Sequence, residues 1–221
     1  MFDGFLLLTL LIGTPGFVLW REQRRRRQGA PPRLRRYLET AILASVLLGL
    51  LAADWAATGR MPAALGLDWP LSARSLDLML VATTVLAALL ALSNLGALRG
   101  KAPPAPSPDS PLPATRAEFI AFLPLTILVG VAWEALFRGF LLYALTPVVG
   151  LFGAVAMASV AYAAAHGVAE LRRLMASLAA ALAFTLAYAF SHSLWWLIIL
   201  HAGLPMIGAS AQFRAQARAS T

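Results

Sequence analysis

Four polar side chains lie inside long apolar runs where lipid or protein core is expected. They are Glu134 and Arg138 in VAWEALFRGFLL, His166 at the end of YAAAH, and His201 in WWLIILHAGLP. Ionisable groups inside a bilayer are costly, so each is a functional hypothesis by default. One carboxylate and two imidazoles around a buried space suit general acid and base work on a water molecule. The same three groups also form a zinc ligand set, although we favour a site without a cofactor.

The spacing of Glu134 and Arg138 has its own consequence. They are four residues apart, so a helix places both on one face as an ion pair. That pair lowers the cost of burying both charges. It is equally consistent with a structural role, in which it only fixes this helix against its neighbours.

The composition indicates that membrane-spanning helices must hold these residues. Of 221 residues, 60% are hydrophobic and 13% are charged, with no cysteine. Ordinary soluble domains carry about 25% charged residues, which excludes nearly all water-soluble folds. The lack of cysteine excludes disulfides, thiolate zinc sites and cysteine nucleophiles. The net charge of +8 lies in short clusters between apolar runs, so we expect no nucleic-acid partner.

Seven segments approach the roughly 20 apolar residues that a spanning helix needs. The sequence therefore predicts an all-α polytopic membrane helix bundle of about seven transmembrane helices, with the lipid bilayer as a partner. The segments are residues 5–20, 38–56, 76–98, 119–144, 151–165, 174–190 and 194–209.

The distribution of arginine and lysine predicts the orientation. Eight arginines follow the first segment between residues 21 and 36, and the other basic clusters fall in alternate loops, apart from Arg60 and Arg74. Basic loops stay in the cytoplasm. We therefore expect a multi-pass protein of the cell (cytoplasmic) membrane, with the N-terminus outside and the C-terminus cytoplasmic.

The depths of the polar residues test whether they can meet. A hairpin turning near residues 147–150 places Glu134 about 14 residues before the turn and His166 about 17 after it. At roughly 1.5 Å per residue their depths differ by about 5 Å, so they can face each other. His201 is expected to lie shallower, which requires a tilted or distorted helix for all three to converge.

Three motifs in this order, WEALFRG, YAAAH and SLWWLIILHAGLP, resemble those of the CPBP family of intramembrane proteases. That family includes the type II CAAX prenyl proteases and the Abi proteins. The resemblance implies a catalytic set of Glu134, His166 and His201, supported by Arg138 and Tyr162.

Two positions depart from the family pattern. Trp133 stands where the family has a glutamate that helps to activate the hydrolytic water, and Pro205 stands where it has an asparagine proposed to stabilise the oxyanion. Glu134 projects about 100° around the helix from position 133, so it can replace the missing base only if the helix rotates or distorts. Loss of one oxyanion donor typically costs about 10² to 10³ in rate.

Two functions follow from the resemblance, and the sequence leaves open whether the chain is an enzyme. The first is an intramembrane endopeptidase that hydrolyses a peptide bond of a membrane-embedded or lipid-modified, prenylated substrate. The alternative is a catalytically impaired pseudoprotease that acts as a membrane scaffold or immunity-type binding protein. A proton-relaying transporter is disfavoured, because no pair of broken helices recurs in both halves.

The chain divides into four parts. Residues 1–98 form N-terminal anchoring helices, and residues 99–116 a proline-rich cytoplasmic linker. Residues 117–212 form the CAAX-protease-like transmembrane domain, and residues 213–221 a basic C-terminal tail.

Overall fold

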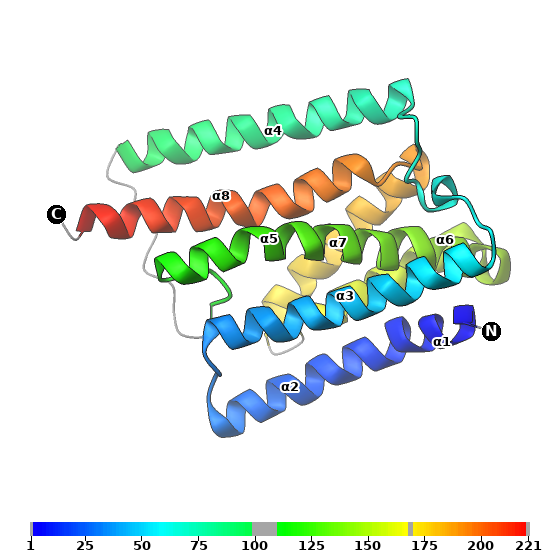
Figure 1. The fold of residues 1–221 in the computed structure, drawn as a ribbon, viewed down its shortest axis with the longest axis horizontal. Coiled ribbons are helices and arrows are strands. Elements are labelled where there is room, and N and C mark those ends of the chain that lie inside the picture. The colour runs from blue at the N-terminus through cyan, green and yellow to red at the C-terminus, as the bar shows by residue number, and fades with distance from the viewer. Residues whose placement is uncertain (1, 99–109, 168–169, 220–221) are drawn as a thin grey trace.

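The computed structural model describes residues 2–98, 110–167 and 170–219, and over these residues it contains helices and no strand. The helices pack into one bundle (Figure 1). The elements, in chain order, are α1 (Phe2–Leu8), η1 (Thr9–Gly13), α2 (Thr14–Gln28), α3 (Arg33–Ala57), η2 (Pro62–Leu65), α4 (Ala73–Leu98), α5 (Arg116–Trp133), η3 (Glu134–Phe140), α6 (Leu141–Ala165), α7 (Leu171–Ser191) and α8 (Trp195–Ala219).

Among the described residues, six helical runs are long and apolar enough to cross a membrane. One of them, Arg116–Ala165, has 50 residues, or about 75 Å of helix, against roughly 30 Å of bilayer core. Gly150 interrupts it with φ 72° and ψ 168°, and the chain turns back there (Figure 1). This run therefore provides two passes, and the predicted bundle of about seven helices is confirmed.

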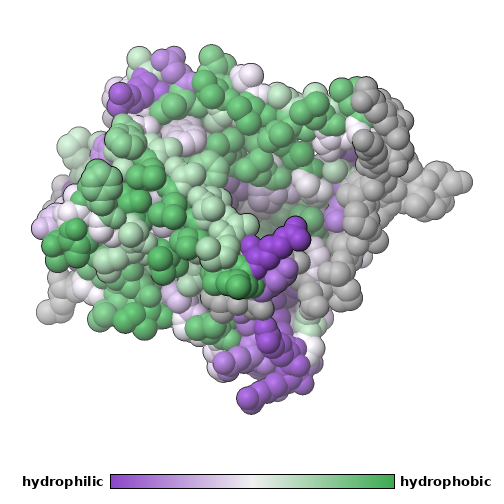
Figure 2. All heavy atoms as spheres, turned by 180° about the vertical axis from the view of Figure 1, so that it is seen from behind, coloured by the Kyte–Doolittle hydropathy of each residue, from purple (hydrophilic) through white to green (hydrophobic). Residues whose placement is uncertain are grey.

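The centre of the bundle is formed by α5, η3 and the start of α6. Figure 1 shows α5 between α3 and α8, with α2 outside α3 and α4 outside α8. All seven residues of η3 are buried. The back face is largely covered by apolar side chains, and hydrophilic ones gather where α2 joins α3 (Figure 2). Such a surface suits lipid contact around the middle and water or headgroups at the ends.

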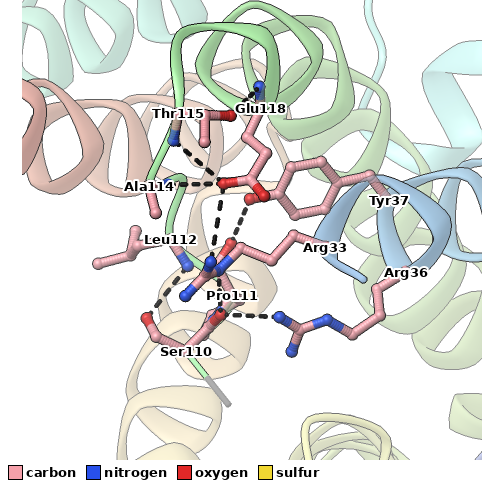
Figure 3. Close-up of polar contacts among 9 residues, drawn as sticks. All are labelled: Arg33, Arg36, Tyr37, Ser110, Pro111, Leu112, Ala114, Thr115 and Glu118. Carbon is pink, nitrogen blue, oxygen red and sulfur yellow. Dashed lines mark hydrogen bonds and ion pairs between the residues drawn. The ribbon is translucent and has the colours of Figure 1, made fainter. Parts of the chain in front are cut away.

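The beginning of α5 is fixed to α3 (Figure 3). A capping box forms at Thr115 and Glu118, whose side chains each bond the other residue's backbone N–H. The Tyr37 hydroxyl donates to the Pro111 carbonyl at 2.6 Å, and Arg33 Nε donates to the Ser110 carbonyl at 3.3 Å. The described end of the predicted linker therefore packs on α3, whereas residues 99–109 lie outside the described residues.

Candidate active site

Glu134 is the centre of a buried polar group at the junction of α5 and η3. Its Oε1 lies 2.6 Å from Arg138 Nη1 and 2.6 Å from His201 Nδ1. Only 2% of the Glu134 and Arg138 side chains is exposed, and 15% of that of His201. One carboxylate oxygen thus holds a guanidinium from its own chain segment and an imidazole from α8.

A π-helix positions Glu134. Residues Glu134–Phe140 form η3, and the backbone N–H of Leu141 donates to the carbonyl of Leu136 five residues earlier. Single π turns inside α-helices are rare and are frequently found at functional sites. The π-helix begins at Glu134, whereas Trp133 and Glu134 themselves keep α-helical backbone angles, so the distortion alters the turns that follow Glu134.

Glycines set the register between this segment and α8. A Cβ at Gly130 would lie 3.4 Å from the backbone of Ala202 on α8. One at Gly139 would lie 3.1 Å from the carbonyl oxygen of Leu65 in η2 and 3.3 Å from Leu194, directly before α8. The two segments run antiparallel (Figure 1), so these close approaches place His201 beside Glu134. The His201 side chain thus reaches Glu134, and the helix that carries Glu134 is distorted, as the sequence analysis required for convergence.

Arg138 lies in an aromatic environment. Its guanidinium carbon is 4.4 Å from the ring centroid of Tyr162 and 5.9 Å from that of Phe184. Cation–π contacts of this kind stabilise a desolvated cation. Tyr162, which sequence reasoning included as a supporting residue, thus contacts the ion pair directly from α6. Phe184, on α7, was not found from the sequence because an apolar residue in an apolar helix gives no signal.

His166 contacts Tyr162 and lies near His201 at the edge of this polar group. It caps the end of α6, and its Nδ1 is 2.9 Å from the Tyr162 carbonyl oxygen. Its ring centroid is 4.1 Å from that of Tyr162 and 6.2 Å from that of His201. No direct bond joins it to Glu134 among the described contacts. His166 is exposed at the rim of the group.

A cavity of about 230 Å³ opens beside these residues. Glu134, Arg138 and His201 supply its polar groups, and its other lining residues are Tyr162, Phe184, Leu197, Leu200, Leu204 and Pro205. Glu134 Oε2 and Arg138 Nε are buried without a hydrogen-bond partner in the described part of the chain. An apolar cavity with a few convergent polar groups is the usual form of a small binding or active site.

The two departures from the family pattern occupy different environments. Trp133 is 6% exposed and belongs to the main hydrophobic core, where its ring packs edge-on against Phe137 at 5.8 Å between centroids. It is not part of the cavity lining. Pro205 does line the cavity, together with His201.

Metal binding by this group has little geometric support. Within residues 2–98, 110–167 and 170–219, no three histidine, aspartate or glutamate side chains are grouped closely enough to hold a metal ion. Glu134 Oε1 is already bonded to Arg138 Nη1 and His201 Nδ1. Zinc binding by Glu134, His166 and His201 stays a hypothesis, and the effect of a metal chelator on cleavage tests it.

Comparison with known families matches residues 115–207 to the type II CAAX prenyl endopeptidase Rce1-like family. We refer to this matched part of the chain as the Rce1-like domain. The family resemblance predicted from the three motifs is confirmed. The match covers residues 115–207, whereas the domain was predicted at 117–212. All the candidate site residues lie inside the Rce1-like domain, and the first 114 residues lie outside it. Comparisons with curated proteins and with solved structures gave no match.

Proposed function

We propose that the Rce1-like domain is an intramembrane endopeptidase that hydrolyses a peptide bond near the prenylated end of a substrate. The family of the domain supports the reaction class, and the multi-pass helical fold supports a substrate that reaches the site from the bilayer. The observation that carries the proposal is how the two carboxylate oxygens of Glu134 are bonded. One of its carboxylate oxygens is held by two nitrogen donors, and the other is buried without a hydrogen-bond partner in the described part of the chain.

In the proposed reaction Glu134 is the general base. Oε2 accepts a proton from a water molecule whose oxygen forms the new bond to the carbonyl carbon of the substrate. The C–N bond then breaks, and Glu134 returns the proton to the leaving amine. Arg138 orients the carboxylate through the ion pair of 2.6 Å between its Nη1 and Glu134 Oε1.

The two imidazoles are proposed to act on the oxygen of the substrate carbonyl. His201 donates from Nδ1 to Glu134 Oε1, so in the proposed step its Nε2 donates to the substrate oxygen only when the imidazole carries a second proton. His166 lies next to it at the rim. A donor aimed at the developing oxyanion is often the largest single contribution to such a reaction, and Pro205 supplies none.

The alternative is a pseudoprotease that binds a membrane segment or prenylated chain without cleaving it. Two observations favour it, the apolar core position of Trp133 and the absence of a donor at Pro205. In this case the cavity would still bind the substrate, while Glu134, Arg138 and His201 would only connect α8 to η3.

The decisive experiment compares binding and cleavage of one peptide by one preparation. Purified protein in lipid nanodiscs is incubated with a farnesylated peptide, and the products are identified by mass spectrometry. We expect cleavage by the wild type, none by Glu134→Gln or His201→Gln, and normal cleavage by the control Glu39→Gln, which removes an exposed surface carboxylate. Binding without cleavage by the wild type would establish the pseudoprotease instead. Cleavage that a metal chelator abolishes would assign the site to zinc chemistry.

The orientation in the membrane is also a proposal. The arginine-rich end of α2, the start of α5 and the end of α8 lie at the same end of the bundle (Figure 1). We propose that this end faces the cytoplasm of the cell, because basic loops are retained there. The loop with η2 then lies outside.

A further inference from the structure

Two cavities adjoin at Arg21 and Arg25, which are half-buried on the last turns of α2. The first has a volume of about 400 Å³ and lies between α2, the loop at residues 29–32 and the start of α3. The second, of about 280 Å³, lies between these two helices and α5 and α8. Both arginines line both spaces. We refer to the first as the hairpin cavity and to the second as the apolar cavity.

The hairpin cavity carries an excess of positive charge. Four arginines line it, and Glu39 is the single carboxylate among its described lining residues. Arg35 Nε pairs with Glu39 Oε1 at 3.0 Å, which accounts for one of the four. In the described part of the chain, Arg21, Arg24 and Arg25 form no ion pair with a carboxylate. Like charges that lie close together repel each other, so an anion bound between these three stabilises their arrangement.

Aromatic rings at the rim indicate that this cavity lies at the depth of lipid headgroups. The side chains of Trp20 and Phe17 are 52% and 39% exposed. The guanidinium carbons of Arg24 and Arg21 lie 5.6 Å and 5.9 Å from the centroids of these two rings. Tryptophan is enriched where a membrane meets water, and hydrophilic residues gather where α2 joins α3 (Figure 2). The cavity is therefore placed to meet the phosphate layer of the bilayer.

The apolar cavity continues from the two shared arginines into the bundle. Apart from its arginines its lining is largely apolar, and on α5 it runs from Phe122 to Val129, a rise of about 10 Å. At one end the ring of Phe122 packs on that of Tyr37, with 5.6 Å between centroids. At the other end the cavity reaches His201, which also lines the candidate active site. A narrow apolar space that begins at the headgroup layer suits an acyl chain.

We propose that an anionic phospholipid binds across the two cavities, with its phosphate in the hairpin cavity and one acyl chain in the apolar cavity. A phosphodiester accepts charge-assisted hydrogen bonds from arginine, and its charge compensates the excess in the hairpin cavity. A zwitterionic lipid carries an additional cation, which the same arginines repel. Lipid tails are as apolar as leucine, so the chain gains little by leaving the bilayer, and the headgroup determines which lipid is bound.

A free phosphate ion would satisfy the arginines only. The apolar cavity would then stay unfilled, and its lining would lose the dispersion contacts that an acyl chain provides. The two cavities together therefore favour a lipid over a soluble anion. Because the apolar cavity reaches His201, the bound lipid borders the candidate active site without being its substrate.

The test measures which lipid stays bound to the protein. The chain is reconstituted in nanodiscs of equal parts phosphatidylcholine and phosphatidylglycerol, released into mild detergent and weighed by native mass spectrometry. Each arginine at a membrane surface contributes about 5-fold to the binding of an anionic lipid. Since three act on one charge, we expect phosphatidylglycerol to be retained at least about 10-fold more than phosphatidylcholine. Equal retention of both lipids would overturn the proposal.

Two matched substitutions locate the headgroup. Arg25→Gln removes a charge that both cavities share, and we expect it to lower the preference for phosphatidylglycerol about 5-fold. Arg27→Gln removes a charge at an exposed position of the same helix end, outside the lining of both cavities, and should keep the preference. Equal effects of the two variants would show diffuse attraction to a basic helix end and refute the site. Arg21→Gln carries the same test if Arg25→Gln does not fold.

A second pair of variants tests the acyl chain. Leu125→Trp fills the apolar cavity, whose wall Leu125 forms. Ile127→Trp adds the same ring at a 53% exposed position of α5 outside that lining. We expect the first variant to lose the bound phosphatidylglycerol and the second to keep it. Full retention by Leu125→Trp would show that no acyl chain occupies the apolar cavity, and the proposal would be wrong.

Inorganic phosphate is the competing source of the same anion. It is added in excess before release from the nanodiscs and compared with sodium chloride at the same ionic strength. We expect it to displace no more phosphatidylglycerol than the chloride does, because it lacks the acyl chain. Specific displacement by phosphate would assign the hairpin cavity to a soluble anion and overturn the proposal. No peptide is present in these measurements, so their result does not depend on whether the chain is a peptidase.

Discussion

Substitution of Glu134 by glutamine should damage both stability and catalysis, by different mechanisms. The glutamine keeps an oxygen for His201 but removes the charge opposite Arg138, and both side chains of that pair are 2% exposed. Breaking a buried pair by removing one partner costs about 3–5 kcal/mol. For a chain of this size one kcal/mol lowers the melting temperature by about 2–4 °C, so Glu134→Gln should melt about 6–20 °C below the wild type.

A second substitution separates the two effects. Arg138→Met removes the uncompensated charge and leaves a flexible apolar side chain that packs well on the ring of Tyr162. Replacement of a whole buried pair by apolar or neutral groups is often nearly neutral for stability. The double variant Glu134→Gln/Arg138→Met should therefore recover most of the lost melting temperature, and it should remain inactive because the base is absent.

The assay is thermal unfolding in detergent, followed by circular dichroism, together with cleavage of the farnesylated peptide. A single variant that melts within about 2 °C of the wild type would refute the reasoning on the buried pair. A double variant as unstable as the single one would refute it too. Cleavage by the stable double variant would show that Glu134 is not the base.

Four further results are expected. Trp133→Glu should lower the melting temperature and give no gain in cleavage, because it places a carboxylate in the hydrophobic core. Pro205→Asn should raise the cleavage rate by about 10-fold or more by adding a donor at the cavity. Burial alone would raise the pKa of Asp68, but hydrogen bonds from Ser72 and Ser75 hold that pKa below its ordinary value. Asp68→Asn should therefore be less stable than the wild type at pH 7. This difference in stability should vanish as the pH falls through the pKa of Asp68 in the folded state. Because the chain has no cysteine, an impermeant maleimide should label Met61→Cys in intact cells and Gln28→Cys only after permeabilisation.

The sequence predicted the membrane helices well because hydropathy is a sum over some 20 residues and tolerates local errors. The predicted turn near residues 147–150 coincides with Gly150, whose positive φ the structure shows. The pairing of Glu134 with Arg138 followed from their spacing and is present at 2.6 Å. Such features depend on periodicity and on local chemistry, both of which can be read without knowing which helices touch.

The relative depths of the histidines could not be predicted in the same way. Counting residues at 1.5 Å assumes straight α-helices, whereas η3 is a π-helix, and no residue in EALFRGF signals that change. The contact of His201 with Glu134 depends on close approaches at Gly130 and Gly139. These involve partners more than 50 residues away in the chain, and only the packed structure reveals them.

The first hundred residues are more than an anchor for the Rce1-like domain. Leu6 and Leu10 are 1% and 0% exposed and belong to the same hydrophobic core as Phe137 and Phe140 of η3. The ring of Trp55 on α3 packs edge-on against Phe140 at 6.3 Å between centroids. The π-helix that carries Glu134 is therefore enclosed partly by residues outside the family match. The packing around the candidate base therefore depends partly on helices that no family motif identifies.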